Sequence, residues 1–429
     1  MRVAKTLKGM SKMGKSAKEL YDEREKRFQD VVNLKRPDRV PITTITGYFL
    51  YQYAGLTPKE AMYDYEKAAA AFKESLRKLN WDIAPNHSSI YPGPLFELFG
   101  ITQFKWPGFN LPDHYDPQWV EDEYMKAEEY DELLADPGDF TIRKLLPRIA
   151  KVFEPFANLP PLHWFGSSLT LYPMVGNLAG LPPFVQVLDR LKEIGTEAAR
   201  FNGVNQRLEK ELAEEGFPII YGSASLAPYD WITDLLRGMK GIMLDMYRNP
   251  EKLLAAIDLF TSVALQAPIL GAQRINNPRV FVPLHRGAGG FMSNEQFAKF
   301  YWPGLKKIIL AIIDAGLTPI VFFEGDYTPR LEFLAELPKC KVVGRFQIVD
   351  LNKFKEVLGD TMCFMGNVPS SLLVTGKPQQ VKDYVKMLID TFADTGGLIV
   401  DGGTGVPKDC RPENVEAMTE TVFEYGVYR

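Results

Sequence analysis

The chain has 429 residues, 46% of them hydrophobic, and a formal net charge of −4. This length accommodates two average domains or one α/β barrel with insertions. The slightly acidic balance argues against a nucleic-acid partner, because phosphate binding needs concentrated Lys and Arg. Cys340, Cys363 and Cys410 are widely spaced and form no CxxC pair, which indicates a reducing compartment and a cytoplasmic protein.

Residues 1–36 predict an N-terminal helical arm. Its first 20 residues are basic and lack a continuous apolar core, so they match neither a signal peptide nor a membrane span. No later apolar stretch approaches the roughly 20 residues needed to cross a bilayer, and we expect no membrane association.

The next segments begin an alternation of strands and helices. A β-branched run predicts a strand over 40–46, an amphipathic helix follows over 59–79, and a short strand is expected over 81–85. Residues 88–217 then depart from this rhythm. They hold an acidic stretch, a Pro-rich and aromatic stretch, and a helix expected from about Pro183 to Glu214. We interpret them as an insertion or lid; its aromatic residues suit a large apolar ligand, and structural packing explains them equally well.

After Phe217 the alternation is regular. Strands are predicted over 218–223, 279–284, 319–323, 341–346, 362–366 and 397–401, each followed by a helical segment. With the first two strands this gives about eight strand–helix units, typical of an α/β protein built as a (β/α)₈ TIM barrel. The barrel would occupy residues 37–429, with the insertion at about 88–217.

Barrel enzymes place their chemistry at the carboxyl ends of the strands. The side chains expected there are polar or aromatic, and we take them as candidate site residues: Tyr48, Asn86, His87, Tyr229, Asp230, His285, Phe322, Glu324, Asp326, Asn367 and Asp401.

Two of these candidates stand out. His285 ends an apolar strand before a Gly-rich loop, where it would act as a metal ligand, as an acid–base group, or as a neutral residue that holds the loop. Glu324 follows four apolar residues, and partial desolvation there would raise its pKa and make it a proton donor. The alternative is a structural Glu paired with Arg286 or Arg345.

The remaining candidates leave alternatives open. Asp401 begins DGGTGVP, where it would contact a ligand or shape the turn. Asn86 and His87 would contact a ligand or hold their loop. The Gly-rich runs GAGG and GGTG lack the spacing of a dinucleotide or nucleoside triphosphate site.

Three segments carry a family resemblance. GNVPSSLLVTGKPQQVKD, GGLIVDGGTGVPKDCRPENVEAM and the early RPDRVPI resemble the uroporphyrinogen decarboxylase superfamily, and the resemblance extends from about Arg24 to Arg429. It implies a (β/α)₈ barrel and an activity among decarboxylases and corrinoid-linked methyltransferases.

Departures from the family pattern narrow the choice. The Arg-rich loop of true decarboxylases is replaced by TGYFLYQYAG, their catalytic Asp is replaced within APNHSSIYPG, and their Tyr falls near Asp234. A polyanionic porphyrinogen would therefore bind poorly. The zinc motif of related thiol methyltransferases aligns with Phe322–Gly325 and its last Cys with Thr404, which argues against zinc and thiol activation. A metal held by His285, Glu324 and Asp401 stays an alternative.

The branch that remains resembles methyltransferase I of anaerobic aryl-ether O-demethylase systems. The resemblance implies methyl transfer from a small methoxylated aromatic to the Co(I) cobamide of a separate corrinoid protein. Glu324, with His285, Asp326 or Asp401 nearby, would protonate the leaving phenolate, and aromatic residues such as Tyr48, Phe165 and Phe322 would hold the ring. The alternatives are a decarboxylase or other lyase acting on a less anionic substrate, and a non-catalytic cobamide or tetrapyrrole binder. A homodimer is also left open.

Overall fold

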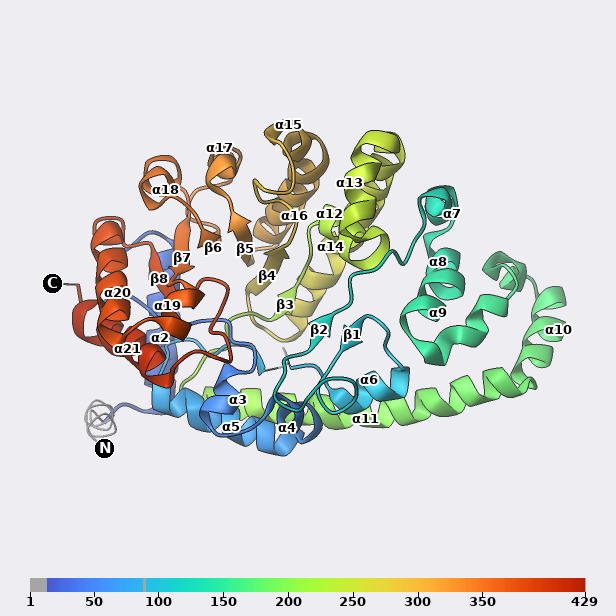
Figure 1. Ribbon diagram of the computed structural model, residues 1–429, viewed down its shortest axis with the longest axis horizontal. Helices are drawn as coiled ribbons and strands as arrows, with labels where there is room; N and C mark the ends of the chain where they lie inside the picture. Colours follow the sequence, from blue (N-terminus) through green and yellow to red (C-terminus); the bar gives the residue numbers. More distant parts are fainter. Residues whose placement is uncertain (1–13, 88–89, 429) are drawn as a thin grey trace.

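The computed structural model describes residues 14–87 and 90–428 and contains a parallel sheet surrounded by helices (Figure 1). The strands follow one another in the order β3-β4-β5-β6-β7-β8, so each pairs with its neighbour in the sequence. Their bounds are Ser223–Ala224, Arg279–Leu284, Thr318–Asp326, Val343–Ile348, Cys363–Asn367 and Leu398–Asp401. The α/β class is confirmed, and all six late strands overlap or adjoin the predicted ranges.

The two earliest predicted strands are shorter than expected. Residues 40–46 and 81–85 make only isolated parallel bridges, at Ile42 with Val400, at Thr46 with Val406 and at Ala84 with Ile219. The Asp82 amide also donates to the Ile42 carbonyl, 2.9 Å away, so both segments lie between β8 and β3 and give a barrel-like ring. A regular ladder does not form there because Pro41 has no N–H and the Ile42 N–H is taken by the Asp82 carboxylate at 2.9 Å.

Helices follow the strands and cover the outside of the sheet, as the apolar periodicity predicts (Figure 1). The helix expected over 59–79 is divided into two by Asp64, whose carboxylate caps the second part. The bounds of the helices outside the insertion and after α2 are α3 Phe49–Tyr53, α4 Pro58–Tyr63, α5 Tyr65–Leu79, α12 Pro228–Ile232, α13 Gly238–Arg248, α14 Pro250–Arg274, α15 Asn294–Gln296, α16 Trp302–Asp314, α17 Leu331–Leu334, α18 Leu351–Leu358, α19 Ser370–Thr375, α20 Pro378–Phe392 and α21 Pro412–Tyr425.

The N-terminal helix α2, Ala17–Val32, closes the amino-terminal end of the strands. Phe28, Val31 and Val32 form one core cluster with buried residues of the ring, among them Ile83, Ile220, Ile320, Val343, Cys363 and Ile399. Arg27 of α2 pairs with the buried Asp82 carboxylate at 2.7 Å. Apolar packing and buried charge pairs therefore hold this helix against the barrel. The first 13 residues of the predicted arm lie outside the described residues.

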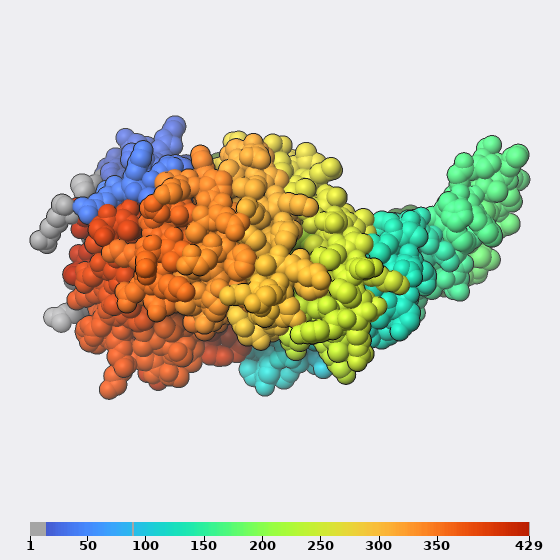
Figure 2. Space-filling model, turned by 90° about the horizontal axis from the view of Figure 1, so that it is seen from above, coloured from blue at the N-terminus to red at the C-terminus, as the bar shows by residue number. Residues whose placement is uncertain are grey.

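The insertion has two structurally different parts. Helix α6 Gly93–Phe99, the short strands β1 Phe104–Lys105 and β2 Gln118–Trp119, and helices α7 Tyr130–Ala135, α8 Pro137–Phe140 and α9 Leu146–Ile149 stay close to the barrel. The chain then projects outward through the 3₁₀ helix η5 Leu162–Gly166 and helix α10 Ser168–Ala179, and α11 Pro182–Glu214 returns it (Figures 1 and 2). The return helix agrees with the prediction. The aromatic stretch that includes Phe165 is no lid, because it extends away from the body of the molecule.

Helix α14 corrects a second expectation. By length and composition it is apolar enough to cross a membrane, although the sequence was expected to contain no such stretch. In the structure it packs on the sheet, where its Ala264 and Pro268 carbonyls accept hydrogen bonds from Ser225 and Ser223. Its apolar character thus has a role in covering β3 and β4.

Candidate active site

The candidate active site is centred on His285, the residue after β4. Its Nδ1 pairs with the Asp234 carboxylate on the short π-helix η6, Thr233–Arg237. The imidazole is 32% exposed, whereas the Asp234 side chain is 13% exposed. The pair thus anchors one ring nitrogen and leaves Nε2 without a hydrogen bond to any described residue. Such an arrangement is that of a proton donor or acceptor held in one orientation.

Asp230 fixes the turn that presents His285. Its fully buried carboxylate accepts hydrogen bonds from the backbone N–H groups of His285 at 2.9 Å and Arg286 at 3.1 Å. The Tyr301 hydroxyl donates a third, at 2.5 Å. Burial raises the pKa of Asp230 to about 6. Asp230, expected to contact substrate, is therefore a positioning residue.

The charges around His285 determine its protonation. Burial of the ring lowers the pKa of His285, but the hydrogen bond to Asp234 and the charges of Asp230, Asp234 and Glu324 outweigh that effect. The result is a pKa of about 9. At neutral pH the side chain is an imidazolium, and Nε2 carries a proton that can be donated.

Glu324 lies near this imidazolium at the end of β5, where its side chain is partly buried. The arginine partners considered for it are engaged elsewhere. Arg286 pairs with Glu121 at 3.3 Å and approaches Asp234 at 3.9 Å. Glu324 makes no ion pair with any described residue, and it remains available to a ligand.

Asp326 and Asp401 do not join this group. Asp326 is exposed, and its carboxylate accepts the Thr328 N–H at 2.9 Å, which is a turn interaction. Asp401 is fully buried and pairs with Arg345, with 2.7 Å between Nε and Oδ2. The Arg345 guanidinium also lies 4.1 Å from the centre of the Phe322 ring, so Phe322 belongs to this interior contact.

The alternative metal site is not assembled. Within residues 14–87 and 90–428, no three His, Cys, Asp or Glu side chains are grouped so that they could hold a metal ion. Asp401, the third proposed ligand, is committed to Arg345. The donor set therefore does not fit zinc, and we derive no step through a metal held by His285, Glu324 and Asp401.

Several other candidates prove to be core residues or to make local contacts. His87 is buried, its Nδ1 lies 2.9 Å from the Tyr51 hydroxyl, and burial lowers its pKa to about 4, so it is neutral. Tyr48 and Tyr229 are also buried, at 5% and 1% exposure. The Asn86 amide donates to the Tyr221 carbonyl at 3.3 Å. Of the alternatives stated for Asn86 and His87, the structure shows the local contacts.

A second feature of the strand ends is a pocket of about 410 Å³ beside β6, β7 and β8. Asn367 lines it and is held by the Tyr384 hydroxyl at 3.1 Å. Gln347 lines it too, and its side-chain oxygen accepts the Gly325 N–H at 2.7 Å, which connects the pocket wall to the residue after Glu324. The other lining residues include Ser370, Ser371 and Thr404. The lining consists of neutral side chains, several of which can donate and accept hydrogen bonds.

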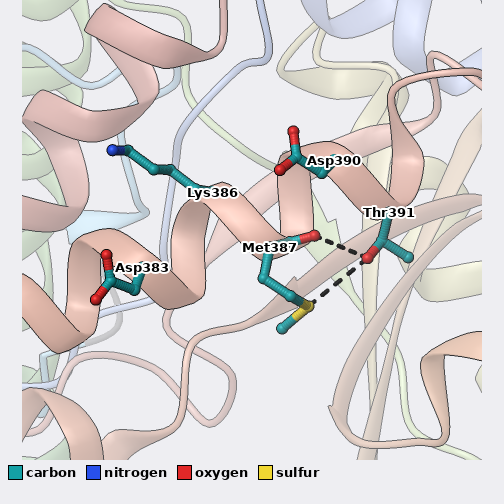
Figure 3. Close-up of a pocket in the computed structure, with 5 residues that line it drawn as sticks. All are labelled: Asp383, Lys386, Met387, Asp390 and Thr391. Carbon is teal, nitrogen blue, oxygen red and sulfur yellow. Dashed lines mark hydrogen bonds between the residues drawn. The ribbon is translucent and has the colours of Figure 1, made fainter.

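A larger hollow of about 510 Å³ lies on helix α20 (Figure 3). Asp383, Lys386, Met387, Asp390 and Thr391 line it, and all five come from that one helix. The hollow is therefore a surface feature of α20 that does not include the strand-end candidates.

Asp234 is the main residue that the sequence reasoning did not select. It lies 51 residues before His285, so no local spacing connects the two. The available signal was its position in APYDWITDLLRG, where the family's Tyr was expected. Tyr301 gave no comparable signal, because it acts through one contact formed by the fold.

Comparisons with known proteins agree with this architecture. A family model described as Uroporphyrinogen decarboxylase (URO-D) matches residues 156–425. The uroporphyrinogen decarboxylase of Geobacter metallireducens is 29% identical over 225 residues, which cover 50% of this chain and 62% of that protein. The uroporphyrinogen decarboxylase of Aromatoleum aromaticum is 24% identical over 141 residues, which cover 32% of this chain and 39% of that protein. The match thus spans less than two thirds of these curated relatives.

Among solved structures, a methyltransferase from Methanosarcina mazei has a TM-score of 0.60 at 16% identity, and the match covers 94% of this chain and 98% of that one. This likeness shows a shared fold over nearly the whole length of both chains. The family model covers more than half of the sequence, including all of β3 to β8. The protein therefore belongs to the uroporphyrinogen decarboxylase (URO-D) family.

Proposed function

We propose that this protein is a methyltransferase that moves the methyl group of a methoxylated aromatic compound to the Co(I) cobamide of a corrinoid protein. The observation that carries the proposal is the imidazolium of His285, anchored through Nδ1 by Asp234 with Nε2 open at the strand ends. Loss of a methyl group from an aryl ether produces a phenolate, and a cationic proton donor stabilises that leaving group.

The charge of the site favours a neutral substrate over a polycarboxylate. Carboxylates of Glu121, Asp234 and Glu324 surround the cationic His285 and Arg286. Both cations are already compensated, so a porphyrinogen with many carboxylates would meet net repulsion. A methoxyarene carries no charge that this site would oppose.

The proposed reaction requires little covalent chemistry from the protein. A Co(I) cobamide would supply a strong nucleophile for the methyl group, and the methyl carbon–oxygen bond would break with its bonding electrons left on the oxygen. His285 then transfers its Nε2 proton to that oxygen, giving a phenol and a neutral imidazole that regains a proton from water. Asp234 keeps the ring oriented during both transfers.

The neutral pocket beside β6, β7 and β8 is consistent with a cobamide acceptor. The ring of a cobamide carries carboxamide side chains, which both donate and accept hydrogen bonds. Gln347, Asn367, Ser370 and Thr404 can do the same without adding charge. In this arrangement the acceptor would lie over β6 to β8, next to Glu324 and His285.

The function is tested by incubating the purified protein with free cob(I)alamin and a panel of methoxyarenes related to guaiacol and veratrole. The expected result is loss of cob(I)alamin absorbance with release of an equal amount of the matching phenol. His285→Gln should lower kcat/KM by about 10²- to 10⁴-fold, the usual contribution of a general acid. His114→Gln, at an exposed histidine, is the matched control and should retain activity.

Two outcomes would decide against the proposal. If no methoxyarene transfers its methyl group to cob(I)alamin or to reduced corrinoid proteins, the function is wrong. Release of CO₂ from an aromatic acid without any cobamide, dependent on His285, would instead support a decarboxylase, because the same imidazolium could protonate the carbanion left by CO₂.

A further inference from the structure

Residues 121–125 of the insertion, here called the acidic strap, lie against the end of η6, the π-helix that carries Asp234. The Met125 N–H donates a hydrogen bond to the Leu236 carbonyl, 2.7 Å away. The Arg237 guanidinium donates in return to the Met125 carbonyl at 2.5 Å. A segment of the insertion therefore contacts the helix whose carboxylate orients His285.

The contact between the acidic strap and η6 is closely built. Gly238, directly after η6, has a φ of +63°, and a Cβ at that position would lie 2.9 Å from the Asp122 carbonyl oxygen. Arg237 is 3% exposed, and it pairs with Glu123 of the strap and, at 2.6 Å, with the buried Asp245 of α13. Because breaking a buried charge pair is costly, the strap and η6 keep one fixed position relative to each other.

Glu121 begins the acidic strap and connects it to the residue that follows His285. Its Oε1 accepts a hydrogen bond from the Met239 N–H in the first turn of α13, where N–H groups have no partner within the helix. Its Oε2 accepts a hydrogen bond from Arg286 Nη2 at 3.3 Å. One side chain thus ties Arg286 to the end of a helix.

Arg286 lies between two carboxylates that could each hold it. Its Nη2 is 3.3 Å from Glu121 Oε2 and 3.9 Å from Asp234 Oδ1, while Asp234 Oδ2 is paired with His285 Nδ1. The Nε of Arg286 is buried and makes no hydrogen bond within the described parts of the chain. Without Glu121, the guanidinium would therefore move onto Asp234. A second cation beside the His285 ring would then favour the neutral imidazole.

We propose that Glu121 is a positioning residue of the active site, which keeps Arg286 away from Asp234 and so leaves that carboxylate to His285. The charged groups that face His285 are Asp230, Asp234, Glu324 and Arg286, and Glu121 acts on the last of these. The consequence for catalysis rests on the proposed function, in which His285 must carry a proton. The consequence for the pKa of His285 does not.

The test is a histidine NMR titration of the full-length protein, which needs no substrate. Glu121→Gln keeps the size of the side chain and should lower the pKa of His285, about 9 in the wild type, by about 1 unit as Arg286 moves onto Asp234. Glu128→Gln, at an exposed carboxylate of the 3₁₀ helix η2, Ala127–Glu129, is the matched control and should leave that pKa unchanged.

A double-mutant cycle separates positioning from a simple effect of charge. In the Arg286→Gln background no guanidinium is left to restrain, so adding Glu121→Gln should change the pKa of His285 by less than about 0.3 unit. Glu121 has no positioning role if Glu121→Gln alone leaves the pKa of His285 unchanged. An equal decrease with and without Arg286 would also exclude that role, because Glu121 would then act only as a distant charge.

The rate of methyl transfer provides the functional measurement. If the pKa of His285 falls from about 9 to about 8, the protonated fraction falls about fivefold at pH 9 and hardly at all at pH 6.5, and the rate of Glu121→Gln relative to the wild type should follow. An equal relative rate at both pH values would contradict the assigned role. If the wild type transfers no methyl group, the proposed function fails, while the NMR titration still decides on Glu121.

Discussion

Replacing Asp234 by Asn removes the charge that holds the His285 imidazolium while it keeps a side chain of similar shape. In the wild type, the rise of the His285 pKa from 6.5 to about 9 corresponds to about 3 kcal/mol of preference for the charged form. The ring is 32% exposed, so solvent screening reduces this to about 2 kcal/mol. We expect the pKa of His285 to fall by about 1 to 2 units in Asp234→Asn.

The direction of the effect on stability follows from the same pKa. A group whose pKa is raised by folding stabilises the folded state fully below its unfolded pKa, and this contribution is lost as the pH rises through the folded pKa. For His285 the window runs from about 6.5 to about 9. Asp234→Asn should therefore lower the free energy of unfolding by about 1 to 2 kcal/mol at pH 6, and the difference should disappear near pH 10.

Histidine NMR measures this prediction directly, because the chain has only four histidines. His87 has a pKa of about 4 and is readily distinguished, and the His285→Gln spectrum identifies the His285 resonance as the one that it lacks among the other three. Urea unfolding at pH 6 and pH 10 gives the stability difference. A His285 resonance that titrates near 6.5 in the wild type, or that titrates equally in both proteins, would refute the reasoning.

Three further substitutions test the other assigned roles. Asp230→Asn keeps the size of the side chain but removes one acceptor, so urea unfolding should show a loss of about 2 kcal/mol; an unchanged midpoint would contradict the three hydrogen bonds. Asp401→Asn leaves the Arg345 charge buried without its partner, so the free energy of unfolding should fall by about 3 to 5 kcal/mol in a thermal or urea scan. The kcat per folded molecule should stay within about threefold of the wild-type value. A large loss of kcat at unchanged stability would restore Asp401 to a catalytic role. Glu324→Gln removes one of the charges that raise the His285 pKa, so the rate of methyl transfer should fall less than tenfold and the high-pH limb of the pH–rate profile should shift to lower pH. A loss of rate as large as that of His285→Gln would make Glu324 the proton donor.

Periodicity and strand-end logic anticipated much of the fold. The strand predicted over 279–284 matches β4 because a run rich in β-branched and apolar residues lies there between two turns. The segments at 40–46 and 81–85 were expected as full strands. The ladder is interrupted because Pro41 has no N–H and because the Ile42 N–H donates to the Asp82 side chain instead of to a neighbouring strand. The side chain that replaces the backbone acceptor lies 40 residues away in the sequence, so a local sequence pattern cannot predict this hydrogen bond.

The site was anticipated less completely than the fold. His285 and Glu324 were correctly placed at neighbouring strand ends, because parallel strands bring their carboxyl ends to one side of the sheet. Asp401 has the same sequence context, a carboxylate after an apolar strand, yet it points to a buried arginine. Which carboxylate faces solvent and which faces Arg345 depends on long-range packing. The sequence context therefore predicted strand ends better than it predicted roles.

The bridge between residue 42 and β8 also has a consequence for biosynthesis. The Gly402 amide bonds the Thr44 hydroxyl across 358 positions of sequence, and Val40 bonds Gly426. At a translation rate of about 5 to 20 residues per second, roughly 20 to 70 s separate the synthesis of these two sides of the ring. During that interval the early segments emerge from the ribosome without their partner strand, and their unpaired backbone groups are exposed to other chains. Closure of the ring is thus a late event in the synthesis of the chain.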